Sequence, residues 1–239
     1  MSKVHLARSG FITKAALPSI TRERGTITGT SNLMLFGAGK TTVSNNTTFI
    51  DSSTDAFTVT RNGDTVHSGH NPFSTVSDGS AYFDGDLDYL SIPANAGFNF
   101  GTGDFTVESF VYIAGNSPLD GQSRRYALIF GVGSGGGMSF ELLIAGNSST
   151  TGTGIELYNG SVAVGVSGTV SQSTWHHIAV SRSGSSFYFF LNGVQLGTTQ
   201  TSSISFGSST QTAVVGKDPV TSAYDFDFNG YISNLRVIK

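Results

Sequence analysis

One stretch, WHHIAVSRSGSSFYFFLNGVQLGT at residues 175–198, restricts the fold more than any other part of the chain. Its two apolar runs are separated by the turn-forming residues RSGSS, and the second run ends at Asn192-Gly193. Both of these residues tolerate positive φ, which makes the pair the strongest short signal of a β-hairpin. We therefore predict two hairpins in series, with Trp175 buried in the core where the first strand starts.

The two adjacent histidines of this stretch, His176 and His177, raise the question of a metal site. On a strand, successive side chains point to opposite faces of the sheet. The pair therefore cannot bind one ion from the same face, and we expect structural roles for both.

The rest of the chain has the composition of an all-β protein. Glycine is abundant, with 31 of 239 residues, and only 12% of residues are charged, which disfavours helices. From Leu33 onward, short apolar or alternating runs are separated by Gly, Asn, Asp and Ser, which is typical of a sandwich or barrel. The run FTVESFVYI at 105–113 is expected to be a long central strand. Its pattern places Phe105, Val107, Ser109, Val111 and Ile113 on one face and Glu108, Phe110 and Tyr112 on the other.

Four ordered motifs carry a resemblance to a known family. They are SAYFDGDLDYLSIP at 80–93, FNFGTGDFTVESFVYI at 98–113, the stretch 175–198 and FNGYISNLRVIK at 228–239. In this order and spacing they resemble the laminin G-like, concanavalin A-like lectin/glucanase superfamily, in the form found in virion proteins of tailed bacteriophages. The resemblance implies a jelly-roll sandwich of two antiparallel sheets over residues 30–239. This fold hosts lectins, enzymes, adhesion modules and capsid proteins alike, so activity must be argued from the residues.

Residues 1–29 differ from this domain in charge. They carry five basic residues and one acidic residue, a net charge of +4, whereas residues 30–239 carry −7. An acidic body disfavours nucleic-acid binding, which needs clustered Lys and Arg. The segment is too short to form a core of its own, so we expect an extended basic arm that docks on another chain. No segment has the length of apolar sequence that membrane insertion requires.

Catalytic residues are not expected. The superfamily's glucanases carry paired glutamates on one strand face, because retaining hydrolysis needs carboxyl groups about 5 to 5.5 Å apart. This chain holds only four glutamates, and no two have a spacing of two or four residues; they are Glu23, Glu108, Glu141 and Glu156. The chain also lacks cysteine and a Gly-x-Ser-x-Gly motif.

Two binding sites are candidates. Aspartates at alternate positions in DGDLD, with others near the C-terminus, could ligate calcium; they are Asp84, Asp86, Asp88, Asp225 and Asp227. The alternative is that they cap turns or are solvated, and no cofactor is required. A glycan site would pair aromatic rings with amide groups, and the candidates are Tyr158, Asn159 and Tyr224.

Taken together, the sequence predicts a non-enzymatic structural protein of a virion, either a capsid decoration or a tail or fibre component. It would be located in the virion, form a homo-oligomer and contact other virion proteins through the arm. The alternative is a glycan-binding adhesin module that contacts host surface polysaccharide.

Overall fold

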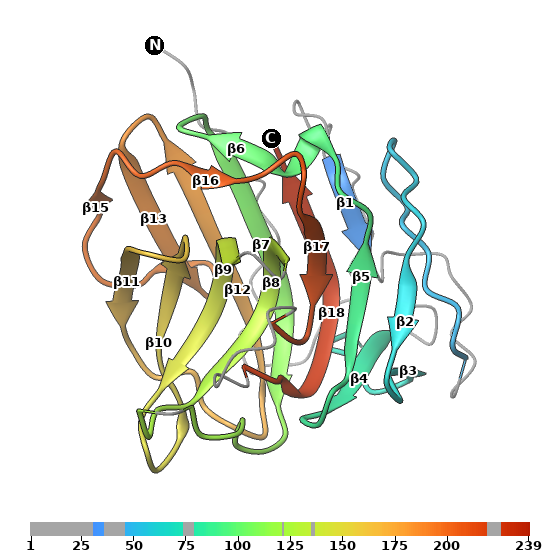
Figure 1. Cartoon of the computed structure of the whole chain (residues 1–239). Helices are drawn as coiled ribbons and strands as arrows, with labels where there is room; N and C mark the ends of the chain where they lie inside the picture. The colour runs from blue at the N-terminus through green and yellow to red at the C-terminus, as the bar shows by residue number, and fades with distance from the viewer. Residues whose placement is uncertain (1–30, 36–45, 74–78, 121, 135–136, 219–225) are drawn as a thin grey trace.

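Two large antiparallel sheets pack face to face in the computed structural model (Figure 1). It describes residues 31–35, 46–73, 79–120, 122–134, 137–218 and 226–239. Within these ranges the only helix is the three-residue η1 (Ala96–Phe98). The predicted all-β jelly-roll sandwich is confirmed. The predicted arm at 1–29 lies outside the described residues.

The nine-stranded sheet contains the C-terminal strand and both predicted hairpins. Its main path runs β14 (Val194–Gln195), β13 (Ser186–Leu191), β12 (Trp175–Ser183), β7 (Phe105–Ile113), β18 (Asn229–Ile238), β4 (Ser80–Asp84) and β3 (Val66–Ser68). Beside this path, β1 (Ser31–Leu35) pairs with β18, and β15 (Gln200–Thr201) pairs with β13.

The seven-stranded sheet forms the second layer. Its order is β11 (Ala163–Ser167), β10 (Thr151–Tyr158), β9 (Gly137–Gly146), β8 (Tyr126–Ser134), β17 (Thr212–Val215), β5 (Tyr89–Ile92) and β2 (Thr60–Asn62). A small ladder joins β6 (Asn99–Gly101) to β16 (Phe206–Gly207).

Side chains of both sheets alternate between the core and the outside. On β7 the predicted division holds, because Phe105, Val107, Ser109, Val111 and Ile113 are buried while the residues between them are partly exposed. The interior is rich in phenylalanine, and these rings contact one another at centroid distances of about 5 to 6 Å, as between Phe100 and Phe140 at 5.1 Å. Burial of this aromatic and aliphatic surface holds the two layers together.

The hairpin turn between β13 and β14 has the predicted geometry. Asn192 and Gly193 have φ values of 51° and 77°, so both adopt the left-handed conformation that a two-residue hairpin requires. The side-chain oxygen of Asn192 also accepts a hydrogen bond of 2.9 Å from the backbone N–H of His177, which ties the turn to β12.

The prediction that Trp175 lies in the core is wrong. Ile178 and Val180 are fully buried between the sheets. Because side chains alternate along β12, His176 points inward with them and Trp175 points outward with His177. Trp175 is therefore a partly exposed residue on the outer face of the nine-stranded sheet, and the two histidines lie on opposite faces as expected.

Candidate functional site

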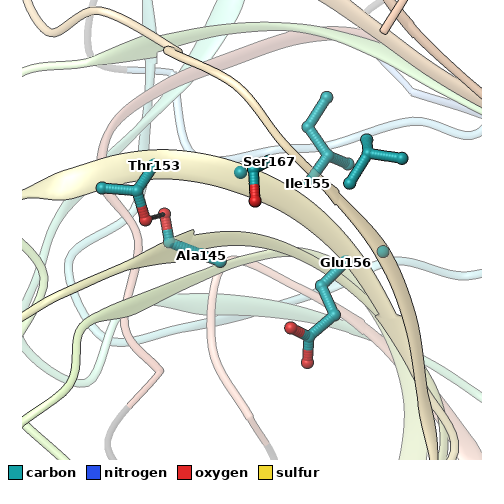
Figure 2. Close-up of a pocket in the computed structure, with 8 residues that line it drawn as sticks. Ala145, Thr153, Ile155, Glu156 and Ser167 are labelled. Carbon is teal, nitrogen blue, oxygen red and sulfur yellow. Dashed lines mark hydrogen bonds between the residues drawn. The ribbon is translucent and has the colours of Figure 1, made fainter. Parts of the chain in front are cut away.

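A shallow pocket lies on the outer face of the seven-stranded sheet, on strands β9 to β11 (Figure 2). Its volume is about 280 Å³. The pocket is lined by Ala145, Thr153, Gly154, Ile155, Glu156, Gly165, Val166 and Ser167. Elsewhere on this face, a small apolar cluster that includes Tyr126, Leu143 and Phe226 covers the sheet.

Two glycines leave the base of the pocket without side chains. Gly154 pairs with Ser167, and Gly165 pairs with Glu156, across the β10–β11 ladder. A Cβ atom at Gly154 would lie 2.7 Å from the carbonyl oxygen of Val166, and one at Gly165 would lie 2.9 Å from that of Ile155. Neither position has room for a side chain, so the polar backbone stays uncovered beside the Glu156 and Ser167 side chains.

The polar side chains of the pocket come from neighbouring strands. Figure 2 shows the oxygen atoms of Glu156 and Ser167 pointing to the same side of the ribbon. Burial raises the pKa of the Glu156 carboxyl, and the positive charge of Arg124 offsets part of that rise. Arg124 also forms an ion pair with Asp120 at 3.0 Å. The pocket thus offers hydroxyl and carboxylate oxygens that can bind the hydroxyl groups of a ligand.

The structure describes two of the three predicted glycan-contact residues. Tyr158 lies two residues beyond Glu156 on the same face of β10, next to the pocket. Asn159 is used within the fold, since its Oδ1 accepts hydrogen bonds from the N–H groups of Ser161 and Val162 and its Nδ2 donates to the carbonyl of Ser205. Tyr224 lies outside the described residues. Their glycan contacts stay a prediction.

Glu141 also lies on this outer face, and the sequence did not predict it there. It pairs with Tyr158 across the β9–β10 ladder, so it shares the outer face with Glu156 on the neighbouring strand. Sequence spacing identifies carboxylates that share a face of one strand, but it cannot identify a pair that lies on two neighbouring strands. Glu141 is only 1% exposed, and its two oxygens have no hydrogen-bond partner among the described residues.

The protonation of Glu141 follows from this burial. Removal from water raises the pKa of the Glu141 carboxyl to about 9, with smaller contributions from the negative charges of Asp218 and Glu156. The group is therefore uncharged at neutral pH. Because it is closed off from solvent, it does not form an accessible catalytic pair with Glu156.

Most of the candidate calcium ligands hold the turn between β4 and β5. Asp88 is buried, and its carboxylate accepts hydrogen bonds from the backbone N–H groups of Asp64 and Asp84. Asp84 accepts from the N–H of Asp86 at 2.8 Å. Asp227 accepts from the N–H of Leu87 at 3.1 Å and pairs with Lys217 at 2.7 Å.

The structure describes four of the five candidate calcium ligands. In the part of the chain that the structure describes, no three or more His, Cys, Asp or Glu residues are grouped so that they could hold a metal ion. Asp225 lies outside that part. The calcium site stays a prediction.

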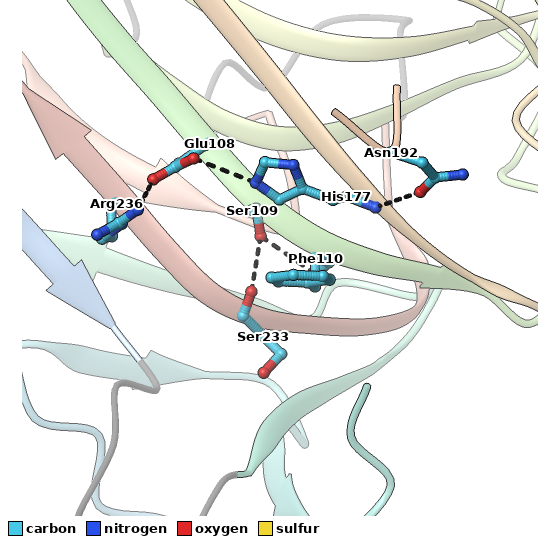
Figure 3. Close-up of polar contacts among 7 residues, drawn as sticks. All are labelled: Glu108, Ser109, Phe110, His177, Asn192, Ser233 and Arg236. Carbon is cyan, nitrogen blue, oxygen red and sulfur yellow. Dashed lines mark hydrogen bonds and ion pairs between the residues drawn. The ribbon is translucent and has the colours of Figure 1, made fainter. Parts of the chain in front are cut away.

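A charged cluster occupies the outer face of the nine-stranded sheet (Figure 3). Glu108 on β7 lies between His177 on β12 and Arg236 on β18 and contacts both, with 3.1 Å between its Oε2 and the Nε2 of His177. Burial alone would raise the pKa of Glu108, but the hydrogen bond from His177 and the charge of Arg236 hold it below its ordinary value. The cluster joins the three central strands.

No described helix is long and apolar enough to span a bilayer.

Among solved structures, domain 4 of AbnA, an extracellular arabinanase from Geobacillus stearothermophilus solved in complex with arabinotriose, is similar to this chain. It is 17% identical with a TM-score of 0.58, and the match covers 85% of this chain and 94% of that chain.

Two structures of botulinum neurotoxins are also similar. One is of type C, whose cell entry depends on interaction with two ganglioside molecules; it is 13% identical with a TM-score of 0.56, over 87% of this chain and 48% of that chain. The other is the binding domain of neurotoxin DC in complex with SialylT, 12% identical with a TM-score of 0.56, over 87% and 47% of the two chains. This chain thus spans about half the length of the toxin chains. At these identities the likeness shows the fold.

No curated protein matches the chain. A family model does match, and it covers residues 84–239, which is more than half of the sequence and includes the strands of the pocket. This chain belongs to the concanavalin A-like lectin/glucanases superfamily.

Proposed function

We propose that this chain is a glycan-binding module and not an enzyme. The observation that carries the proposal is the pocket on β9 to β11, whose lining includes the hydroxyl groups of Thr153 and Ser167 and the carboxyl group of Glu156, with Tyr158 next to it on the same face of β10. A sugar has both hydroxyl groups and apolar C–H faces. Polar groups at fixed positions next to an aromatic ring complement both.

The similar structures support this proposal at the level of the fold. The arabinanase domain, which this chain matches over almost its full length, was solved with arabinotriose bound. Glu156 further favours neutral sugars, because an acidic sugar would place a second acidic group beside it in the same pocket. The carboxyl of Glu141 is closed off from solvent, so it does not give Glu156 the second accessible acid that glycoside hydrolysis uses.

The test compares variants of the pocket with a matched control. We expect Glu156→Gln, which replaces a charged acceptor by a neutral amide, and Ser167→Ala, which removes a hydroxyl group, each to weaken binding to a neutral oligosaccharide by about tenfold, or roughly 1.4 kcal/mol. Thr201→Ala, an exposed hydroxyl on β15 of the other sheet, is expected to bind like the wild type. Binding would be screened on immobilised glycans and measured by calorimetry with the best ligand.

Two results would contradict the proposal. One is a complete absence of binding to neutral and acidic glycans by the folded wild-type protein. The other is steady release of product sugars that Glu156→Gln abolishes, which would make the chain an enzyme.

We also propose the virion role as the setting in which such a module works. The argument is the charge difference between residues 1–29, at +4, and residues 30–239, at −7, which favours docking of the basic segment on an acidic neighbouring protein. Deletion of residues 2–29 is then expected to leave a folded domain that no longer enters particles. Normal incorporation of the truncated protein would place the docking surface on the sandwich itself.

A further inference from the structure

Four aromatic side chains form a row across the outer face of the nine-stranded sheet. Tyr231 on β18 pairs directly with Tyr82 on β4 and with Tyr112 on β7, and Tyr112 pairs with Trp175 on β12. All four are partly exposed. The row lies on the layer opposite the pocket of β9 to β11, so it is a separate surface.

Three of these rings close into a cup. The centroid of the Tyr112 ring lies 5.7 Å from that of Trp175 and 5.7 Å from that of Tyr231. Trp175 and Tyr231 belong to strands on either side of β7, so upright rings would stand roughly 9.6 Å apart, twice the strand spacing. Their centroids are only 6.4 Å apart. The two rings therefore lean toward each other across Tyr112.

The side chain of His70 sits in this cup. Its ring centroid lies 4.6 Å from that of Tyr112, 4.7 Å from that of Tyr231 and 5.3 Å from that of Trp175. The main chain of His70 is anchored, because its N–H donates to the Ser68 hydroxyl and its carbonyl accepts from the Ser80 hydroxyl.

The imidazole itself is held more weakly than its main chain. It makes no hydrogen bond to the residues that the structure describes, and His70 is exposed. It can therefore rotate out of the cup without breaking a described hydrogen bond.

The chemistry of the cup points to a cation. A positive charge within about 6 Å of the centre of an aromatic ring is attracted by the negative ring face, most strongly for tryptophan. A group at the position of the His70 ring lies within that distance of three rings at once. Residues 30–239 carry a net charge of −7, so the surrounding domain also attracts cations.

We propose that Tyr112, Trp175 and Tyr231 form a binding site for a trimethylammonium group and that the His70 side chain occupies this site in the free protein. A trimethylammonium group is weakly hydrated, has no hydrogen-bond donor and fills a cup of rings. It therefore suits a site whose three described walls are aromatic rings. His70 acts as a plug that a ligand must displace, so its removal strengthens binding.

The experiment uses the only tryptophan of the chain as its reporter. The wild type and His70→Ala are titrated with tetramethylammonium and with choline while the fluorescence of Trp175 is recorded. We expect a saturable change with an affinity at least tenfold higher in His70→Ala. The matched control is His177→Ala. His177 lies two residues after Trp175 on the same face of β12. This variant is expected to bind both ligands with the affinity of the wild type.

Further arms test the charge and the ring requirement. The uncharged isostere 3,3-dimethyl-1-butanol is expected to produce no saturable change, and adding Tyr112→Leu to His70→Ala is expected to abolish binding of tetramethylammonium. His70→Ser serves as a second variant without the plug if His70→Ala folds poorly by circular dichroism.

A separate experiment identifies the source of the trimethylammonium group. Sedimentation of the protein with phosphatidylcholine vesicles, but not with phosphatidylglycerol vesicles, would identify a lipid headgroup. Binding of free choline alone would identify a soluble ligand.

Three outcomes would overturn the proposal. The first is the absence of a saturable response in a folded variant that lacks His70. The second is an equal response to the uncharged isostere, which would make the cup a general apolar site. The third is equal affinity of the wild type and His70→Ala, which would show that His70 is not a plug.

Discussion

Glu108 on β7 and His177 on β12 are joined across the outer face of the nine-stranded sheet, with 3.1 Å between Oε2 and Nε2. Arg236 on β18 contacts the other carboxylate oxygen, so one acid links three adjacent strands. These strands are neighbours in space, but the two contacts of Glu108 join residues that are 69 and 128 positions apart in the sequence. The cluster therefore forms only when the sheet is complete.

We predict that Glu108→Gln lowers the free energy of unfolding at neutral pH by about 1 to 3 kcal/mol, as expected for loss of a charge-assisted contact. The folded pKa of Glu108 lies below its ordinary value, so its contribution is present above the unfolded pKa and is lost as the pH falls through the folded pKa. Urea denaturation at a series of pH values checks this. A constant difference between the two proteins down to strongly acidic pH would contradict it.

Glu141→Gln is predicted to have the opposite effect. The folded pKa of about 9 lies above the ordinary value of 4.5, so ionisation of the unfolded chain destabilises the fold as the pH rises from about 4.5 to about 9. Glutamine cannot ionise. The variant is thus expected to be more stable than the wild type by an amount that grows over this range and then levels off. Thermal unfolding of both proteins against pH measures the difference, and parallel curves would refute the assignment.

Trp175→Ala is predicted to be milder than truncation of a core aromatic residue. Phe187 is fully buried between the sheets, and Phe187→Ala is expected to cost about 3 to 5 kcal/mol. Trp175 is partly exposed and loses mainly ring contacts, so we expect a cost of roughly 1 to 2 kcal/mol. Denaturant unfolding of the two variants side by side tests the ranking. Equal costs would place Trp175 in the core after all.

Calcium is tested by chelation. If calcium uses Asp86 together with the other aspartates of the β4–β5 turn, a chelator should lower the melting temperature, because a ligand bound only to the native state stabilises it. Asp86 is exposed, so Asp86→Asn should remove this effect without damaging the turn that Asp88 holds. A melting temperature that is identical with and without chelator would exclude calcium from the fold.

Much of the architecture could be predicted from local pattern. The alternation on 105–113 and the Asn192-Gly193 turn correctly indicated a long strand and a tight hairpin, because both depend on backbone geometry that neighbouring residues determine. The same alternation, applied from Ile178 and Val180 backward along β12, would also have placed Trp175 outside. Trp175 lies outside because the burial of Ile178 and Val180 determines which face each side chain of β12 takes.

The candidate site was less accessible to sequence reasoning. Tyr158 was identified, but Glu156 and Ser167 were not, because they meet only through the register of the β10–β11 ladder. Glu141 and Glu156 are 15 residues apart in the sequence and lie on the same face only because β9 folds back on β10. Hairpin register depends on bulges such as the one between Thr151 and Gly154, which the sequence pattern did not reveal.

The sequence by itself determined the all-β class, the strand faces and the family, since each follows from short-range periodicity or from motifs in order. Only the tertiary structure decided which side chains from distant strands meet. Tyr82, Tyr112, Trp175 and Tyr231 form one row because β4, β7, β12 and β18 are adjacent in the sheet. The physical reason is that burial of the whole inner face, to which contacts along the entire chain contribute, selects the strand order of a sandwich. The side chains that become neighbours on the outer face are a consequence of that order.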